Sequence, residues 1–462
     1  MTGDYPCFSS DIGLDMSTDS SSSLASRKTL FLPYYYLFVH TPIPLDKYMN
    51  KVLNYHRKAG VSQGDSPDFA PIWCGKKRYR VLIAILIKAI PIYFGLRYFH
   101  WMLQAFGFFP DTHAVPRTGP LRFAVAIPAH NEGASIARTV RSLLSAGARP
   151  EDIYILCNGC KDDTAEQVRS CGVEPVIAPV RGKEETLTWA CSEAKFFGRY
   201  THVCFFDADT EIDGQFFKVI RDRLRNDASI DIICGKPKSL PHNWLTAHRA
   251  VQYWSFHKLH KESQAKVGAI LVVPGCAGVY SIEALKKIVW SPDTRIGDMD
   301  ATIQASLLGM HIAFEPKAFV LTQDPATLAD YTTQLYRRWY RGLWMNMRKH
   351  GVLWKGWTRP MNWSCRAMIF DQFLPFLYLG AVWYFHLHYS TSSAVLIFGG
   401  LVFAETAICA WSEKRWDIVL YSPLFFPLRL YDTVLFVAAS WTILLRREKS
   451  GVWKSPTRYP VR

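Results

Sequence analysis

Two carboxylates stand at alternate positions directly after a short apolar stretch. Thr201–Phe206 has the pattern of a buried strand, and Asp207 and Asp209 follow it. Carboxylate oxygens are preferred ligands of Mg²⁺ and Mn²⁺, and such cations commonly take substrate phosphates as further ligands. The pair therefore suits a divalent cation that binds a phosphorylated substrate. An acidic loop closing a strand is the alternative, because Asp-x-Asp alone is common.

Polar clusters follow two earlier apolar stretches as well. Phe123–Ile127 and Ile153–Leu156 each have the pattern of a buried strand, and each leads into the start of a helix. Carboxylates at a helix start suit the helix dipole, so capping is the alternative role for the second cluster. The candidate binding residues in these clusters are Pro128, His130, Asn131, Glu132, Asn158 and Asp162.

A basic turn precedes a third helical stretch. Arg181-Gly182-Lys183 stands where an amphipathic segment begins. Anions are favoured at a helix N-terminus, so Lys183 is a candidate contact for a diphosphate group. A solvated basic turn is the alternative.

The elements that must position these residues alternate in type. Apolar runs at 122–127, 153–156, 174–178 and 201–206 alternate with amphipathic stretches at 135–146, 164–171 and 183–197. Alternation of this kind predicts strand–helix units with a parallel sheet. Ligands of such sheets bind at the carboxyl ends of the strands, where the candidate residues fall.

Four of these motifs occur in an order that resembles a known enzyme family. IPAHNE, NGCKDDT, RGK and DADT are similar to the nucleotide-binding half of the inverting family 2 glycosyltransferases. The resemblance covers roughly Phe123 to Trp344. It implies an α/β domain of the GT-A fold and a nucleotide-diphosphate donor, with UDP-sugar expected. It also implies Mn²⁺ or Mg²⁺ on Asp207 and Asp209. Most relatives carry Asp at Cys157, so base recognition is left to Asp162 or to backbone groups.

The acceptor half of the resemblance lies further along the chain. Val273–Tyr280, with Gly275 and Cys276, resembles the acceptor-side loop. The family then carries a Glu-Asp pair whose Asp deprotonates the acceptor, and this chain has Gly297-Asp298 there. A base is needed because a sugar hydroxyl is a poor nucleophile at neutral pH. The resemblance implies Asp298 as the base, with Asp300 as the alternate and helix capping as the other reading of both.

A cationic aromatic segment resembles the Gln-x-x-Arg-Trp motif of the family. Its matched pair is Arg338-Trp339, which the resemblance implies contacts the donor diphosphate and the acceptor. Gln334 stands one residue too far from this pair, and Leu335 stands where Gln is usual. An amphipathic helix at a membrane interface would have the same residues.

The composition of the chain indicates which kinds of partner its positive charge would bind. The 462 residues carry a formal net charge of +15, but there is no arginine-rich tract or RNA-binding signature. Basic residues beside apolar runs favour an anionic membrane surface over nucleic acid. The eleven cysteines have the context of reduced thiols, and Cys157 and Cys160 fit a turn better than a metal or redox site.

The apolar runs predict a membrane protein in five parts. These are a polar tail and interfacial region (1–75), an N-terminal membrane segment (76–110), the transferase domain (120–350), C-terminal transmembrane helices (365–446) and a basic tail (447–462). Three C-terminal membrane elements are expected, at 367–388, 393–411 and 418–445. Because the segments before the first and after the last membrane element are both basic, re-entrant or interfacial terminal segments are the alternative to full spans. Lys414 and Arg415 lie in a loop that should be cytoplasmic, which places the transferase domain in the cytoplasm, at the plasma membrane.

The resemblance implies the processive membrane members, such as chitin-oligosaccharide, hyaluronan, cellulose and poly-N-acetylglucosamine synthases. The expected activity is transfer to an acceptor hydroxyl that builds a polysaccharide or oligosaccharide. The alternative is a single transfer to a lipid, such as ceramide, diacylglycerol or polyprenyl phosphate. A non-catalytic membrane scaffold is a third possibility, motivated by Gly297 and Leu335.

Overall fold

The computed structural model describes residues 115–192, 198–266, 268–354 and 390–445, together with residues 359, 361–362, 364–366, 368–369, 387 and 459. All of them belong to the second of the two units into which the chain divides, Val81–Arg462. The predicted polar tail (1–75), the N-terminal membrane segment (76–110), most of the first C-terminal span (367–388) and the basic tail lie outside these residues.

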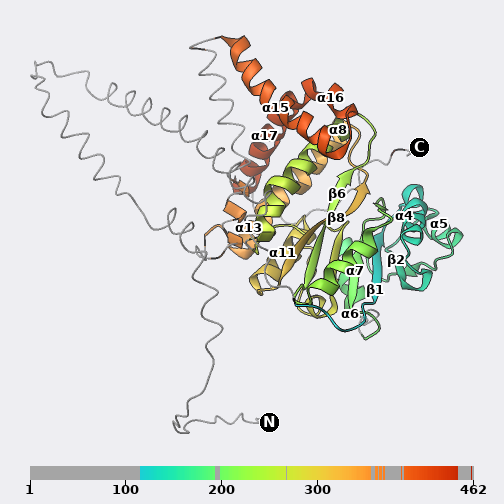
Figure 1. The fold of residues 1–462 in the computed structure, drawn as a ribbon. Helices are drawn as coiled ribbons and strands as arrows, with labels where there is room; N and C mark the ends of the chain where they lie inside the picture. The colour runs from blue at the N-terminus through green and yellow to red at the C-terminus, as the bar shows by residue number, and fades with distance from the viewer. Residues whose placement is uncertain are drawn as a thin grey trace, which may run out of the picture. The chain divides into compact units, whose positions relative to one another are not determined.

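An eight-stranded mixed sheet forms the centre of the domain (Figure 1). Its order is β3-β2-β1-β4-β7-β6-β8-β5. The first four strands are parallel, as predicted, and β7 runs antiparallel to both of its neighbours. The strands are β1 (Phe123–Ala129), β2 (Ile153–Cys157), β3 (Val176–Ile177), β4 (His202–Phe205), β5 (Glu211–Ile212), β6 (Ile232–Ser239), β7 (Gly278–Ser281) and β8 (Ile312–Thr322).

Helices cover both faces of the sheet, which is why β1 is apolar at nearly every position. Alternate residues of a strand point to opposite faces. Val125 and Ile127 accordingly enter one core, with residues of α4 (Gly133–Ser145) and α7 (Phe216–Asn226). Ala124 and Ala126 enter another, with residues of α6 (Lys183–Ser192) and α11 (Gly297–Leu307). The short helix α5 (Thr164–Ser170) lies beside α4.

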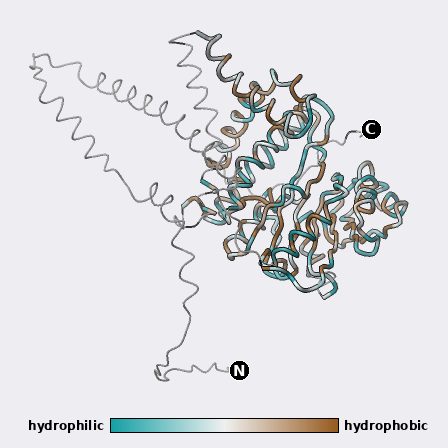
Figure 2. The backbone as a smooth tube through the Cα atoms, viewed as in Figure 1, coloured by the Kyte–Doolittle hydropathy of each residue, from teal (hydrophilic) through white to brown (hydrophobic). Residues whose placement is uncertain are grey.

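A third core joins the domain to the C-terminal helices. It is built from residues of α8 (Trp244–Ser255), η3 (Thr333–Tyr340), α13 (Arg341–His350) and α17 (Ser422–Leu445). Asp432 of α17 accepts hydrogen bonds from Tyr331 (2.8 Å) and Gln252 (2.6 Å). The apolar C-terminal helices therefore pack directly on the α/β domain (Figure 2). The remaining helices are η1 (Pro150–Asp152), η2 (Phe256–Lys261), α9 (Glu262–Lys266), α10 (Ile282–Leu285), α12 (Leu328–Thr332), α15 (Thr391–Glu413) and α16 (Asp417–Leu420).

The second predicted span corresponds to α15, and the third is divided between α16 and α17. Within the described part of the chain, α17 is the one helix that is long and apolar enough to cross a membrane. Three C-terminal spans are thus not confirmed.

Gly235 lies where three strands crowd together, at the register shift of β6 against β8. A first side-chain carbon there would come within 2.9 Å of the carbonyl oxygens of both Ala277 and Ala318. We expect Gly235→Ala to lower the free energy of unfolding by about 1–3 kcal/mol, because backbone groups must move to admit the methyl group. Denaturant unfolding measures this. Gly214→Ala is the matched control, since nothing lies within 4 Å of that position. Equal stability of the two variants would contradict the expectation.

Candidate active site

A pocket opens where the parallel strands of the sheet end, and residues of several strands, helices and loops line it. Its wall includes Pro128 at the end of β1 and Lys183 at the start of α6. Gly275 and Asp298 also line it, and Arg338 comes from η3. Residues from each of the motifs around RGK, the glycine loop, the Gly297-Asp298 pair and the Arg-Trp segment therefore meet in one place.

The Asp-x-Asp carboxylates lie beside this pocket. Asp207 forms an ion pair with Lys183, which lines the pocket. Asp209 is buried, and α4 fixes its loop, because Thr139 donates a hydrogen bond to the carbonyl of Ala208 (2.9 Å). Burial lowers the pKa of Lys183, but the charges of Asp207 and Asp298, together with the hydrogen bond to Asp207, outweigh burial and hold that pKa above its ordinary value. Lys183 therefore stays protonated and positively charged at the place expected for a diphosphate.

The donor set fits a divalent cation that is completed by substrate. Two carboxylates one residue apart follow β4, and the described residues contain no group of three or more His, Cys, Asp or Glu side chains placed to hold a metal ion by themselves. Mg²⁺ is commonly held by one or two carboxylates together with substrate phosphates and water. Asp207 and Asp209 are the residues that would hold such an ion.

Asp298 faces the pocket from the first turn of α11. Its carboxylate accepts a hydrogen bond from the backbone N–H of Gly275 (3.1 Å). This bond ties the glycine loop, with the buried Cys276 next to it, to the start of α11. Asp298 also acts electrostatically on Lys183, so it lies close to the donor side of the pocket. A hydroxyl group that enters between these groups would meet Asp298.

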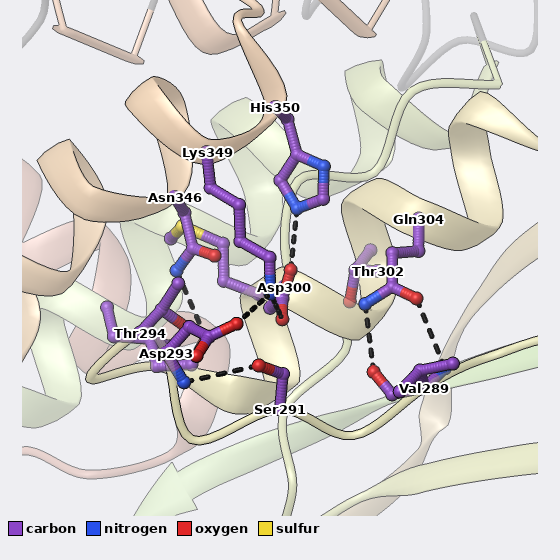
Figure 3. A network of polar contacts seen from close by, with 12 residues as sticks. Val289, Ser291, Asp293, Thr294, Asp300, Thr302, Gln304, Asn346, Lys349 and His350 are labelled. Atoms are coloured by element: carbon purple, nitrogen blue, oxygen red, sulfur yellow. Dashed lines mark hydrogen bonds and ion pairs between the residues drawn. The ribbon is translucent and has the colours of Figure 1, made fainter. Parts of the chain in front are cut away.

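Asp300 faces the opposite way, into a buried ion-pair network (Figure 3). Its oxygens accept hydrogen bonds from Lys349 (2.8 Å) and His350 (2.6 Å) of α13, and its side chain is 1% exposed. Burial alone would raise the pKa of Asp300, but these two bonds outweigh it and hold the pKa below its ordinary value. Asp300 therefore braces α11 against α13.

Removing this brace should cost stability. We expect Asp300→Ala to lower the free energy of unfolding by about 3 kcal/mol, at the low end for breaking a buried ion pair because Lys349 is partly exposed. The folded-state pKa of Asp300 is depressed, so its contribution is fully present above the unfolded pKa of about 3.9 and is lost as pH falls through the folded value. Urea unfolding at pH 7 and in acid measures both. A difference from wild type that stays the same in strong acid would contradict this account.

The two polar loops expected to bind the nucleotide are tied to each other. Asn131 adopts a left-handed backbone (φ 56°), and its side-chain oxygen accepts a hydrogen bond from the backbone N–H of Lys161 (2.8 Å). His130 is hydrogen-bonded to the carbonyl of Asn158 (2.6 Å). These bonds hold the carboxyl ends of β1 and β2 together.

Asp162 closes the same loop pair. It accepts hydrogen bonds from the backbone N–H groups of Gly133 (2.9 Å) and Thr164 (3.1 Å). Burial raises its pKa, but a further hydrogen bond from the hydroxyl of Thr164, together with these backbone bonds, outweighs burial and lowers the pKa. Glu132 is buried and accepts a hydrogen bond from Ser135 (3.0 Å). Asp162 therefore caps the starts of α4 and α5, whereas the side chain of Glu132, the N-cap residue of α4, makes no capping hydrogen bond. Donor binding by both carboxylates stays a prediction.

A π-helix accounts for the irregular spacing of the Arg-Trp segment. Gln334, Arg338 and Trp339 all lie in η3, which is π-helical. Hydrogen bonds in a π-helix span five residues instead of four, so each turn takes one more residue than an α-helix. The one-residue excess between Gln334 and Arg338 falls in this turn. Arg338 reaches the pocket, whereas Trp339 packs against the third core.

Several residues that line the pocket are not among the site residues predicted from the sequence motifs. Tyr280 and Trp290 form an aromatic wall with Phe205, with ring centroids 5.4 to 5.9 Å apart. Glu184 also lines the pocket. The one feature of the sequence that could have indicated a role for Glu184 is its position directly after Arg-Gly-Lys.

Comparison with known proteins agrees with this geometry. Residues 120–342 match the family described as glycosyltransferase like family 2. The poly-β-1,6-N-acetyl-D-glucosamine synthase of Staphylococcus epidermidis is 25% identical over 367 residues, which cover 71% of this chain and 85% of that protein. The same-named enzyme of Staphylococcus aureus strain COL is 23% identical over 54% of this chain and 60% of its own length.

A solved structure shares the fold. The mannosyltransferase of Pyrobaculum calidifontis, determined with GDP-Man and Mn²⁺, superposes with a TM-score of 0.52 at 16% identity and covers 79% of this chain and 100% of its own. The mixed sheet and its flanking helices are thus a GT-A-like α/β fold. Residues 120–342 of this chain are thus a glycosyltransferase domain of the family 2 type.

Proposed function

We propose that this enzyme transfers a sugar from a UDP-sugar to an acceptor hydroxyl, with inversion at the anomeric carbon, and that it extends a polysaccharide. The observation that carries the proposal is the convergence of Lys183, Asp207, Asp298 and Arg338 around one pocket. The cations suit a diphosphate, and the carboxylate across from them suits a hydroxyl nucleophile.

Each residue has a distinct task in this mechanism. Lys183 and Arg338 bind the donor diphosphate in the pocket that they both line. Lys183 does so with a compact ammonium group, and Arg338 with a planar guanidinium group that can donate two parallel hydrogen bonds. Asp207 and Asp209 would hold Mn²⁺ or Mg²⁺, which when bound stabilises the negative charge that develops on the leaving diphosphate. Asp298, oriented by the N–H of Gly275, takes the proton of the acceptor hydroxyl as it attacks. Asp300 is committed to Lys349 and His350, so we assign the base to Asp298.

Two observations support a polymer product made at a membrane. The curated relatives are named as polysaccharide synthases, which favours chain extension over a single transfer to a lipid. The helix α17 is apolar and presents large exposed side chains beside the packed face, namely Leu424, Val434, Trp441, Leu444 and Leu445. Such a surface suits contact with lipid. A cytoplasmic transferase domain at the plasma membrane completes the proposal, with membrane lipids as partners.

A screen of labelled nucleotide sugars on membranes that contain the enzyme tests this proposal. We expect one UDP-sugar to be incorporated into a product that a sizing gel resolves as a polymer. A product confined to a glycolipid that carries one sugar would establish the lipid alternative. No incorporation or nucleotide release from any donor would favour the scaffold.

A further inference from the structure

A carboxylate from another helix occupies the place of the side chain that Gly297 lacks. If residue 297 carried a first side-chain carbon, that carbon would lie 2.6 Å from an oxygen of Glu184 and 2.8 Å from its Cγ. Gly297 stands where the related enzymes carry the Glu of their Glu-Asp pair. The volume beside Asp298 is thus filled by the carboxyl group of Glu184, which belongs to α6, and not by a side chain at position 297 of α11.

This carboxyl group faces the pocket. Glu184, Gly297 and Asp298 all line it. Glu184 is partly buried, and its surroundings contain two cations, Lys183 and Arg338, which outnumber the single charge of Asp298. Burial raises the pKa of Glu184 above its ordinary value, and the two cations reduce this rise without cancelling it.

Glu184 is not engaged by its neighbours in the way that Asp300 is. Among the described residues, no side chain donates a hydrogen bond to it, whereas Lys349 and His350 both donate to Asp300. A partly buried carboxylate that faces a pocket without a side-chain donor requires donors from water or ligand. Sugar hydroxyl groups are such donors.

We propose that Glu184 is a sugar-binding residue of this active site, which takes the place of a side chain at position 297 and accepts a hydrogen bond from a hydroxyl group of the sugar held beside Asp298. The proposal rests on the glycosyl transfer proposed above and adds a residue that determines which sugar is held. The sugar is either that of the donor or the terminal unit of the acceptor, since both meet at Asp298.

An exchange of the carboxylate between the two positions tests the inference. We expect Glu184→Ala to lower kcat/KM by about 10- to 100-fold, the loss of one charge-assisted hydrogen bond. Glu184→Gln should lower it by a smaller factor, because its amide oxygen still accepts a hydrogen bond but carries no charge. Gly297→Glu alone should lose activity, because two carboxyl groups then compete for one volume. The double variant Glu184→Ala, Gly297→Glu should be at least about tenfold more active than Glu184→Ala alone and than Gly297→Glu alone. Glu166→Gln, an exposed carboxylate in the first turn of α5, is the control.

Binding measurements separate sugar contact from a role in folding. Glu184→Gln should bind UDP alone as wild type does. A raised KM for the UDP-sugar would assign the donor sugar, and a raised KM for the acceptor would assign the acceptor sugar. Wild-type kinetics in Glu184→Gln, weakened binding of UDP alone, or a double variant no better than Gly297→Glu would each overturn the inference. A wild-type enzyme that transfers no sugar would instead overturn the proposed function, and the two failures are thereby distinct.

Discussion

Asp298→Asn should lower kcat by about 10²- to 10⁴-fold, the range for loss of a general base. Asparagine can still accept the hydrogen bond from the N–H of Gly275, so the glycine loop should stay in place. What it cannot do is take a proton from the acceptor hydroxyl. The loss should therefore appear in the chemical step, with the affinity for UDP unchanged.

Single-turnover transfer from the UDP-sugar, together with UDP titration, measures both quantities. The unfolding midpoint of Asp298→Asn should match wild type, in contrast to Asp300→Ala. A variant that keeps kcat within a few-fold of wild type would remove Asp298 as the base. Full activity in Asp300→Asn would independently agree with its assignment to the network in Figure 3.

The strand–helix rhythm made the donor half of the site predictable. The apolar runs at 122–127 and 201–206 correspond to β1 and β4, which pair in parallel with Val125 opposite Cys204. Their register brings both carboxyl ends to one edge of the sheet. Once the strands are identified, the placement of Asp207 near the N-terminus of α6 follows from the general geometry of parallel sheets.

The family resemblance favoured Asp298 over Asp300 as the base, but the local sequence pattern gives no physical reason for that choice. Successive residues of an α-helix turn by about 100°, so two residues apart they point to nearly opposite sides. Which side holds the pocket depends on Lys349 and His350, which are 49 and 50 positions further along the chain than Asp300. Local pattern carries no information about a partner at that distance.

The structure explains two departures from the family pattern that a residue-by-residue comparison of sequences leaves unexplained. The extra residue before Arg338 falls in a π-helix, and the absent side chain of Gly297 is replaced by Glu184 from α6. Both involve conformation or a contact between distant segments. Neither departure therefore argues for a non-catalytic scaffold.

Removing one of the metal-holding carboxylates should have the second of the two largest effects. Asp207→Asn should reduce turnover by at least about 10³-fold, because a bound cation contributes several kcal/mol to stabilising charge on the leaving diphosphate. Asparagine is isosteric and can still accept a hydrogen bond from Lys183, so the change removes charge with little loss of packing. Asp209 is buried, and Asp209→Asn should act in the same direction.

Calorimetric titration with UDP, with Mn²⁺ and with a chelator, gives a readout that does not need turnover. Wild type should bind UDP more tightly with Mn²⁺, and Asp207→Asn should bind it equally in both conditions. Asp222→Asn, an exposed carboxylate on α7, should behave as wild type. If Asp207→Asn keeps the Mn²⁺ dependence, the ion is held elsewhere and Asp207 serves only as the partner of Lys183. If it loses the dependence but keeps turnover, Lys183 and Arg338 alone suffice to neutralise the diphosphate, and the metal step is absent from the reaction.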